Sequence, residues 1–132
     1  MDEIEKKVAS QPVGADIKLL GFIDGPDLKN YYSTASVFVM PSKSENFGMS
    51  IFEALHYYKP VIVPEISPWP TLLPKDVMEV VSEDASNLID CLKRSKDKLK
   101  RKSLDFKKLE KVLKRYTDTS ILEEYNDLYN RI

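Results

Sequence analysis

Residues 37–54 read VFVMPSKSENFGMSIFEA, and this stretch decides the fold. It begins with four apolar residues, as a buried strand does, and we expect a helix from about Met49 onward. Glu45 would then lie where the strand gives way to the helix, and Glu53 on the second helical turn. In an open α/β sheet, ligands collect at the carboxyl ends of the strands, where a helix N-terminus offers N–H groups to phosphate. The stretch therefore predicts a pocket for a sugar joined to a nucleotide diphosphate.

Strand and helix patterns alternate on both sides of this stretch. Short apolar runs bounded by turn residues, typical of buried parallel strands, lie at about 17–21, 36–40, 60–64 and 78–81. Helical patterns fit residues 2–9, 26–34 and 49–58, a short segment near Trp69, and residues 85–132 throughout. This alternation predicts an α/β fold: a parallel sheet of about four strands flanked by helices, with a helical C-terminus.

The composition limits the classes of protein that need consideration. The 132 residues, 42% hydrophobic and 31% charged, suffice for about one domain. The 20 basic and 21 acidic residues nearly balance, so we expect no nucleic-acid partner. No apolar run approaches the length of a membrane span, and residues 1–10 are charged rather than signal-like. Cys91 is the only cysteine, which excludes an internal disulfide. These observations favour a soluble, cytoplasmic protein.

The two glutamates belong to a longer pattern. They are spaced as Glu-x7-Glu, with Pro-Ser before Glu45, Phe-Gly after it, and Lys-Pro-Val at residues 59–61. This pattern resembles the donor-binding signature of retaining GT-B glycosyltransferases of the family 4 type, the glycosyl transferases group 1. Residues 17–64 carry most of the resemblance, and residues 113–132 loosely resemble the closing C-terminal helix of that family. The resemblance implies that residues 1–132 form a single incomplete, partial Rossmann-like domain, the nucleotide-sugar-binding C-terminal domain of a GT-B enzyme.

The resemblance also implies a role for each residue of the signature. Donor-sugar contacts are expected from Glu45, Asn46, Phe47 and Gly48, diphosphate contacts from Gly48, Met49 and Ser50, and ribose contacts from Glu53. The residues alone leave other readings open: Glu45 could cap the helix, Glu53 could be an exposed helical glutamate, and Gly48 could serve only the turn. The nucleotide diphosphate sugar would be a substrate, and no cofactor is expected.

Other reactive residue types yield no catalytic or metal site. His56 is the only histidine, which excludes a zinc site built on several histidines, and we expect it to be a packed or surface residue. Cys91 reads as a small buried hydrophobe, and Trp69 and Tyr57 as core residues. Ser42 and Ser44 are candidates for secondary donor contacts. We therefore assign no catalytic residue and no metal ligand.

Two positions depart from the family pattern. Tyr58 stands where the family usually has Gly before Lys-Pro-Val, and a left-handed helix cap there would cost a non-glycine residue about 1 kcal/mol or more. Residues 67–73 read SPWPTLL where the family tends to have a glycine-rich loop near the donor phosphates. The second departure weakens the expected phosphate contacts.

By the resemblance, the chain begins after the first two strands of the donor domain and lacks the acceptor-binding domain. A missing N-terminal half or a partner chain would then supply the acceptor site, and the chain alone would be inactive. The missing strands would separate the strand at 17–21 from the other three and expose strand edges. We therefore expect a rearranged sheet or an intertwined homo-oligomer.

Residues 93–115 are heavily basic. This region could be a solvated helix face, or a surface for anionic lipid or another polyanion that gives peripheral association with the inner face of a membrane.

Two functions of the chain remain open. The first is the donor-binding portion of a glycosyltransferase that moves a sugar from a nucleotide diphosphate sugar to an acceptor hydroxyl with retention. The alternative is a non-catalytic α/β module that binds a nucleotide or a protein.

Overall fold

The computed structural model describes residues 16–44 and 48–117, together with Glu3, Lys6 and Ser10. These residues belong to two compact units, residues 1–31 and residues 32–132. The boundary between the units falls within helix α2 (Gly25–Thr34). The second unit holds all the strands of the described residues and the candidate site.

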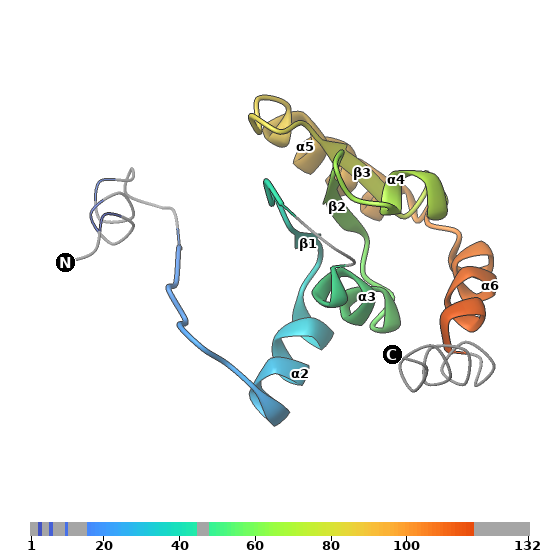
Figure 1. Cartoon of the computed structure of the whole chain (residues 1–132), viewed down its shortest axis with the longest axis horizontal. Helices are drawn as coiled ribbons and strands as arrows, with labels where there is room; N and C mark the ends of the chain where they lie inside the picture. The colour runs from blue at the N-terminus through green and yellow to red at the C-terminus, as the bar shows by residue number, and fades with distance from the viewer. Residues whose placement is uncertain (1–2, 4–5, 7–9, 11–15, 45–47, 118–132) are drawn as a thin grey trace, which may run out of the picture. The chain divides into compact units, whose positions relative to one another are not determined.

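The second unit is built on a parallel sheet of three strands in the order β1-β2-β3 (Figure 1). The strands are β1 (Phe38–Val39), β2 (Val61–Pro64) and β3 (Met78–Val81). Phe38 lies opposite Val61, which in turn lies opposite Met78. All four residues of β2 are buried, as a central parallel strand requires because both of its faces are covered. The predicted parallel α/β architecture is confirmed, with three strands in its sheet.

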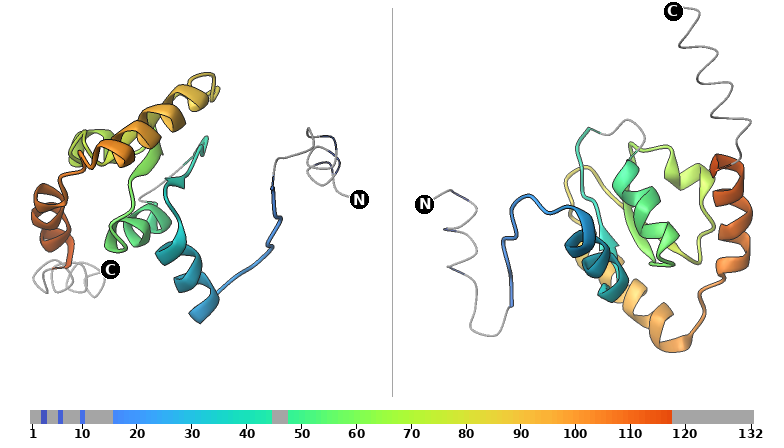
Figure 2. Two further views of the ribbon diagram at one scale, coloured as in Figure 1. Left: turned by 180° about the vertical axis from the view of Figure 1, so that it is seen from behind. Right: turned by 90° about the horizontal axis from the view of Figure 1, so that it is seen from below.

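Helices cover both faces of this sheet (Figures 1 and 2). The helices of the second unit after β1 are α3 (Met49–His56), α4 (Trp69–Leu72), α5 (Leu88–Arg101) and α6 (Phe106–Thr117). On one face, α5 places Cys91 in a cluster with Ile62 and Val81. On the other, α3 and α4 bury Leu55 and Trp69 completely. β2 is the central strand of the sheet and contributes to the core on both faces. The loops that follow the three parallel strands all leave the sheet at the same edge.

Most predicted elements of the second unit are found near their predicted places. The strand predicted at 78–81 has those bounds, the strand at 60–64 begins one residue later, and the strand at 36–40 is reduced to two residues. The predicted C-terminal helical region divides into α5 and α6, because Lys102 takes a left-handed conformation with φ 50° that ends α5. The predicted helix at 2–9 lies largely outside the described residues, and residues 118–132 lie entirely outside them.

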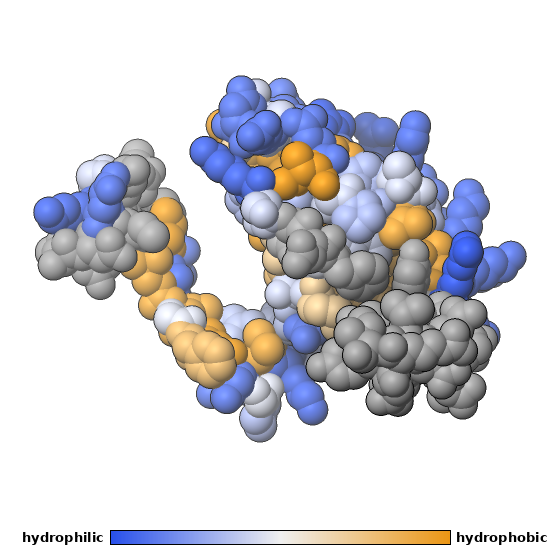
Figure 3. Space-filling view, in the orientation of Figure 1, coloured by the Kyte–Doolittle hydropathy of each residue, from blue (hydrophilic) through white to orange (hydrophobic). Residues whose placement is uncertain are grey.

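The predicted strand at 17–21 is wrong. Residues 16–24 contain no strand or helix, and Ile17, Leu19 and Leu20 are 48%, 51% and 45% exposed. The segment forms a largely hydrophobic surface in Figure 3, and Phe22 is 92% exposed. A strand needs a neighbour to hydrogen-bond with its backbone, and the described residues of the first unit include no other strand. The apolar pattern of a strand is present at 17–21, but the described residues of the first unit offer no neighbouring strand to pair with it.

Within residues 16–44 and 48–117, no helix is both long enough and apolar enough to span a bilayer.

Candidate functional site

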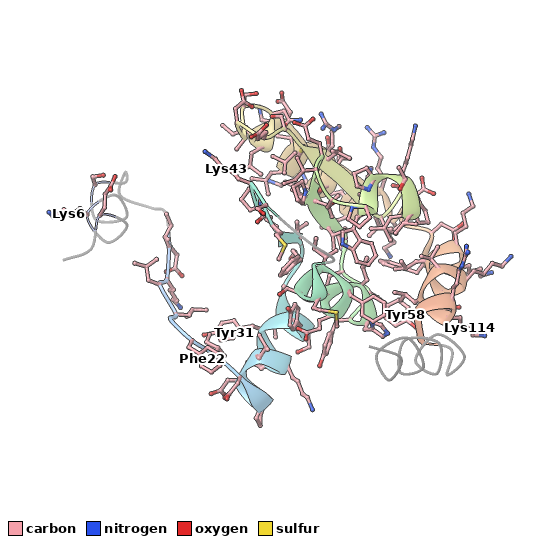
Figure 4. All side chains as sticks on the ribbon, in the orientation of Figure 1. Lys6, Phe22, Tyr31, Lys43, Tyr58 and Lys114 are labelled. Atoms are coloured by element: carbon pink, nitrogen blue, oxygen red, sulfur yellow. The ribbon has the colours of Figure 1, made fainter. Side chains whose placement is uncertain are left out.

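The carboxyl ends of the three strands meet at one edge of the sheet, and a cavity lies there. It has a volume of about 530 Å³, and its walls come from the loops that follow β1, β2 and β3. The lining residues are Lys43, Glu65, Ser82, Glu83, Asp84 and Ser86. Lys43 extends outward from the loop after β1 (Figure 4). This edge is where parallel α/β sheets bind their ligands.

Hydrogen bonds order the loop after β3. The Asp84 carboxylate accepts bonds from the Ser86 N–H at 3.0 Å and from the Ser82 hydroxyl at 2.8 Å. These bonds, the Ser86 backbone bond foremost, lower the pKa of Asp84 to about 2. The Glu65 carboxylate accepts a bond from the Glu83 N–H at 2.8 Å and so ties the loop after β2 to the loop after β3. The edge is therefore preorganised, and its Asp84 carboxylate is ionised at neutral pH.

Sequence reasoning did not single out Glu65, Ser82, Glu83, Asp84 or Ser86. A signal was available, because polar residues directly follow the strands at 60–64 and 78–81. Strand ends in a parallel sheet converge, so these residues could have been grouped with the loop after β1.

The predicted diphosphate site lies at the start of α3. Gly48 is buried with φ 75° and ψ 61°, a left-handed conformation that favours glycine. Its carbonyl accepts bonds from the N–H groups of Ile51 at 2.9 Å and Phe52 at 3.2 Å, which begins the helix. Among the described residues, no acceptor bonds the N–H groups of Met49 and Ser50. The structure thus brings Gly48, Met49 and Ser50 together in one turn, with two amides directed away from the helical ladder.

Glu53, the predicted ribose residue, is held by a tyrosine. The Tyr32 hydroxyl donates a hydrogen bond to Glu53 Oε2 at 3.0 Å and also lies 3.3 Å from the Ser50 carbonyl oxygen. No described residue bonds the other carboxylate oxygen, Oε1. The Glu53 side chain is on an exposed position of α3. One oxygen is therefore fixed, and the other can accept a hydroxyl from outside.

Tyr32 is itself held firmly. It is only 8% exposed, and its ring stacks on Tyr57 at 5.5 Å and lies 5.8 Å from Phe38. Burial, followed by the hydrogen bond to Glu53, raises the pKa of Tyr32 to about 12. Tyr32 therefore remains a neutral donor at any physiological pH. Sequence reasoning placed it in the pattern before β1 but gave it no role in the site, because a contact across 21 residues leaves no local signature.

Glu45, Asn46 and Phe47, the predicted sugar-binding residues, lie outside the described residues. Their roles remain predictions. Ser42 donates to the Ser44 carbonyl at 2.9 Å, a local turn contact within the same loop.

The remaining candidates have structural roles in the described chain. His56 is exposed, with Nδ1 2.9 Å from the Phe52 carbonyl oxygen, and Trp69 is fully buried. Cys91 is buried against the Val80 carbonyl, and this burial raises the pKa of its thiol. Within the part of the chain that the structure describes, no three His, Cys, Asp or Glu residues are grouped so as to hold a metal ion.

Tyr58 adopts the left-handed conformation considered for it, with φ 54°. Its N–H donates to the Leu55 carbonyl and the Lys59 N–H to the Ala54 carbonyl, the bond pattern of a Schellman cap. The Tyr58 ring meets Phe106 edge-on at 5.5 Å, and its hydroxyl donates to Glu110 at 3.3 Å. Tyr58 thus ends α3 and connects it to α6, between which it lies in Figure 4. A glycine at this position could end α3 but could not make the side-chain contacts with α6.

Comparison with known proteins identifies the family of this chain. The family described as glycosyl transferases group 1 matches residues 1–118. The O-antigen biosynthesis glycosyltransferase WclY of Escherichia coli is 26% identical over 136 residues, which cover 99% of this chain and 37% of that protein. The sulfoquinovosyl transferase SQD2 of Arabidopsis thaliana is 31% identical over 75 residues, which cover 57% of this chain and 14% of that protein. The chain thus spans about a third or less of the length of these relatives. No solved structure matches it significantly.

Proposed function

Because the chain belongs to the glycosyl transferases group 1, we propose that it is the donor-binding portion of a retaining glycosyltransferase. The complete enzyme would move a sugar from a nucleotide diphosphate sugar to an acceptor hydroxyl, with retention at the anomeric carbon. The names of the relatives support glycosyl transfer. Their greater length supports a second part, in the same protein or a partner chain, that binds the acceptor and without which this chain is inactive.

The observation that carries the proposal is the bond from Tyr32 to Glu53. A carboxylate accepts strong charge-assisted hydrogen bonds, and fixing one oxygen removes most of the rotational freedom of the group. Glu53 Oε1 can then accept the ribose hydroxyls of the nucleotide without an ordering cost. The acceptor of this bond, Glu53, is on α3, the helix whose first turn carries the residues proposed to bind the diphosphate.

The first turn of α3 supplies the anion site. The N–H groups of Met49 and Ser50 carry partial positive charge at a helix N-terminus, and the absence of a Cβ on Gly48 lets a diphosphate approach the backbone. When the glycosidic bond to the diphosphate breaks, negative charge develops on the leaving group. These amides would stabilise that charge electrostatically, without covalent participation of the protein.

The sugar that is transferred is the remaining part of the donor, after the ribose and the diphosphate. Glu45, Asn46, Phe47 and Gly48 directly precede the diphosphate turn, so a sugar attached to that diphosphate would lie beside them. A carboxylate such as Glu45 would fix the sugar by accepting bonds from its hydroxyls.

Calorimetric titration of the chain with UDP and GDP tests the proposal. We expect one of the two nucleotides to bind, and Glu53→Ala to weaken that binding by about tenfold to 100-fold, the loss of hydrogen bonds to a charged group. Glu110→Ala is the matched control, because Glu110 is also an exposed helical glutamate that accepts a tyrosine hydroxyl. It should bind the nucleotide as the wild type does.

Two results would contradict the proposal. The first is the absence of binding of either nucleotide to the wild-type chain. The second is equal binding by wild type and Glu53→Ala. Either would favour the alternative, a non-catalytic interaction module.

A further inference from the structure

Helix α5 has two faces of different chemistry, and its inner face fixes how the helix is oriented. Cys91 and Ser95 are buried against the sheet. The Glu79 carboxylate on β3 accepts a hydrogen bond from Arg94 Nε and another from Lys98 Nζ, both at 2.7 Å. Burial alone would raise the pKa of Glu79, but these bonds from Lys98 and Arg94 lower it, so the carboxylate stays ionised. Both inner cations are therefore engaged, and α5 cannot easily rotate.

The outer face of α5 carries a stripe of apolar and cationic residues at helical spacing. We call it the α5 stripe: Ile89, Leu92, Lys93, Lys96 and Lys100. Ile89 is 67% exposed and Leu92 42%. All three lysines are exposed, and none of them makes an ion pair with a carboxylate of the described residues. Asp90 and Asp97 lie on the flank of the stripe, toward Arg94 and Arg101 rather than within it.

Positive charge is concentrated in α5 and α6, on and beyond the α5 stripe. Residues 93–115 contain twelve basic and three acidic residues, although the whole chain has a net charge of −1. On α6, Lys107, Lys108, Lys111 and Arg115 are all exposed. Lys114 projects from α6 in Figure 4. The remainder of the chain contains eight basic and eighteen acidic residues, so the excess of positive charge belongs to residues 93–115.

We propose that the α5 stripe docks the protein onto an anionic lipid membrane surface. The lysines would pair with lipid phosphates, and Ile89 and Leu92 would enter the boundary between headgroups and acyl chains. The apolar pair, at the N-terminal end of the stripe, distinguishes a lipid surface from nucleic acid, because a purely phosphate-binding face gains nothing from two exposed aliphatic side chains beside its lysines. Lysine also suits this arrangement, since its aliphatic stem can lie along the apolar layer while its ammonium reaches the headgroups. This inference does not depend on nucleotide binding.

Vesicle co-sedimentation of the full chain tests the inference. We expect binding to vesicles of phosphatidylcholine mixed with phosphatidylglycerol, and little binding to phosphatidylcholine alone. Each cationic side chain near an anionic surface strengthens binding about fivefold, so replacing three lysines by glutamine should weaken it about 100-fold. The variant is Lys93→Gln/Lys96→Gln/Lys100→Gln, which keeps good helix formers on an exposed face and so should fold. A second variant, Ile89→Ser/Leu92→Ser, should lose binding while retaining every charge.

A matched control carries the same change in net charge elsewhere. Lys18→Gln/Lys29→Gln/Lys75→Gln replaces three exposed lysines outside α5, and its binding should stay within about threefold of wild type. Equal losses in the control and in the stripe variant would overturn the inference. So would the absence of binding to anionic vesicles, or an unchanged affinity of Ile89→Ser/Leu92→Ser, which would indicate a soluble polyanion instead of a membrane.

Discussion

Two tyrosine–glutamate hydrogen bonds in this chain look alike but differ in their surroundings. Tyr32 donates to Glu53 at 3.0 Å from a ring that is 8% exposed and stacked on Tyr57. Tyr58 donates to Glu110 at 3.3 Å from a ring that is 51% exposed. A buried donor fixes its acceptor, whereas an exposed one competes with water. The first pair therefore positions a carboxylate of the candidate site, and the second helps to attach α6 to the end of α3.

Removing the rings should give the largest difference between the pairs. Tyr32→Ala deletes a buried ring and leaves a cavity between Tyr57 and Phe38, so it should lower the free energy of unfolding by about 3–5 kcal/mol. Tyr58→Ala removes one edge-on contact with Phe106 and should cost about 1 kcal/mol. Urea denaturation followed by circular dichroism measures both values. Equal losses would contradict the contrast in burial.

Removing only the hydroxyls separates positioning from packing. Tyr32→Phe keeps the stacked ring but releases Glu53 Oε2, so it should cost about 1 kcal/mol of stability and weaken nucleotide binding about fivefold. Tyr58→Phe should leave both quantities nearly unchanged. Calorimetric titration with the nucleotide that binds the wild type gives the comparison. If Tyr32→Phe binds the nucleotide with wild-type affinity, Glu53 does not need the hydrogen bond from Tyr32 in order to bind it.

The left-handed caps sharpen the account of Tyr58. Lys102 ends α5 with φ 50°, as Tyr58 ends α3 with φ 54°, and each is followed by a Schellman pair of hydrogen bonds. Lys102→Gly relieves the backbone strain and should stabilise the protein by up to about 1 kcal/mol. Tyr58→Gly gains the same relief but loses the contacts with Phe106 and Glu110, so it should stabilise less than Lys102→Gly or destabilise. Thermal denaturation of the two variants ranks them, and a larger gain for Tyr58→Gly would show that its ring contributes nothing.

Alkaline titration tests the surroundings of Tyr32 through its pKa. The pKa of Tyr32 is raised from 10.0 to about 12, because burial and Glu53 disfavour the phenolate. The raised pKa stabilises the fold fully below about pH 10, and this contribution is lost as the pH rises toward 12. Tyr32→Phe should therefore lose less stability than wild type over that pH window. In wild type, phenolate absorbance should show one of the seven tyrosines titrating late. A late step of the same size in Tyr32→Phe would contradict the assignment.

Local sequence patterns predicted the second unit better than the first. The apolar runs at β2 and β3 gave their positions to within one residue, because strands buried on both faces need continuous hydrophobicity. The segment at 17–21 has a similar run, but a strand also depends on a neighbour, and no local pattern encodes one. The run therefore predicted a strand that the structure does not contain.

The candidate site shows the same limit. Gly48 was predictable, because a turn between a strand and a helix favours a residue that tolerates positive φ. The contact between Tyr32 and Glu53 was not, because it joins residues 21 apart that the fold alone brings together. Asp84 and Glu65 line the cavity through loops after different strands, and only the strand order shows that these loops meet.

The most direct test of the central claim is a map of amide chemical shifts during titration with the nucleotide. If α3 holds the donor, the largest changes will fall on Gly48, Met49, Ser50 and Glu53, and Tyr32 will respond with them. Changes confined to other elements, with these amides unmoved at saturation, would contradict the account.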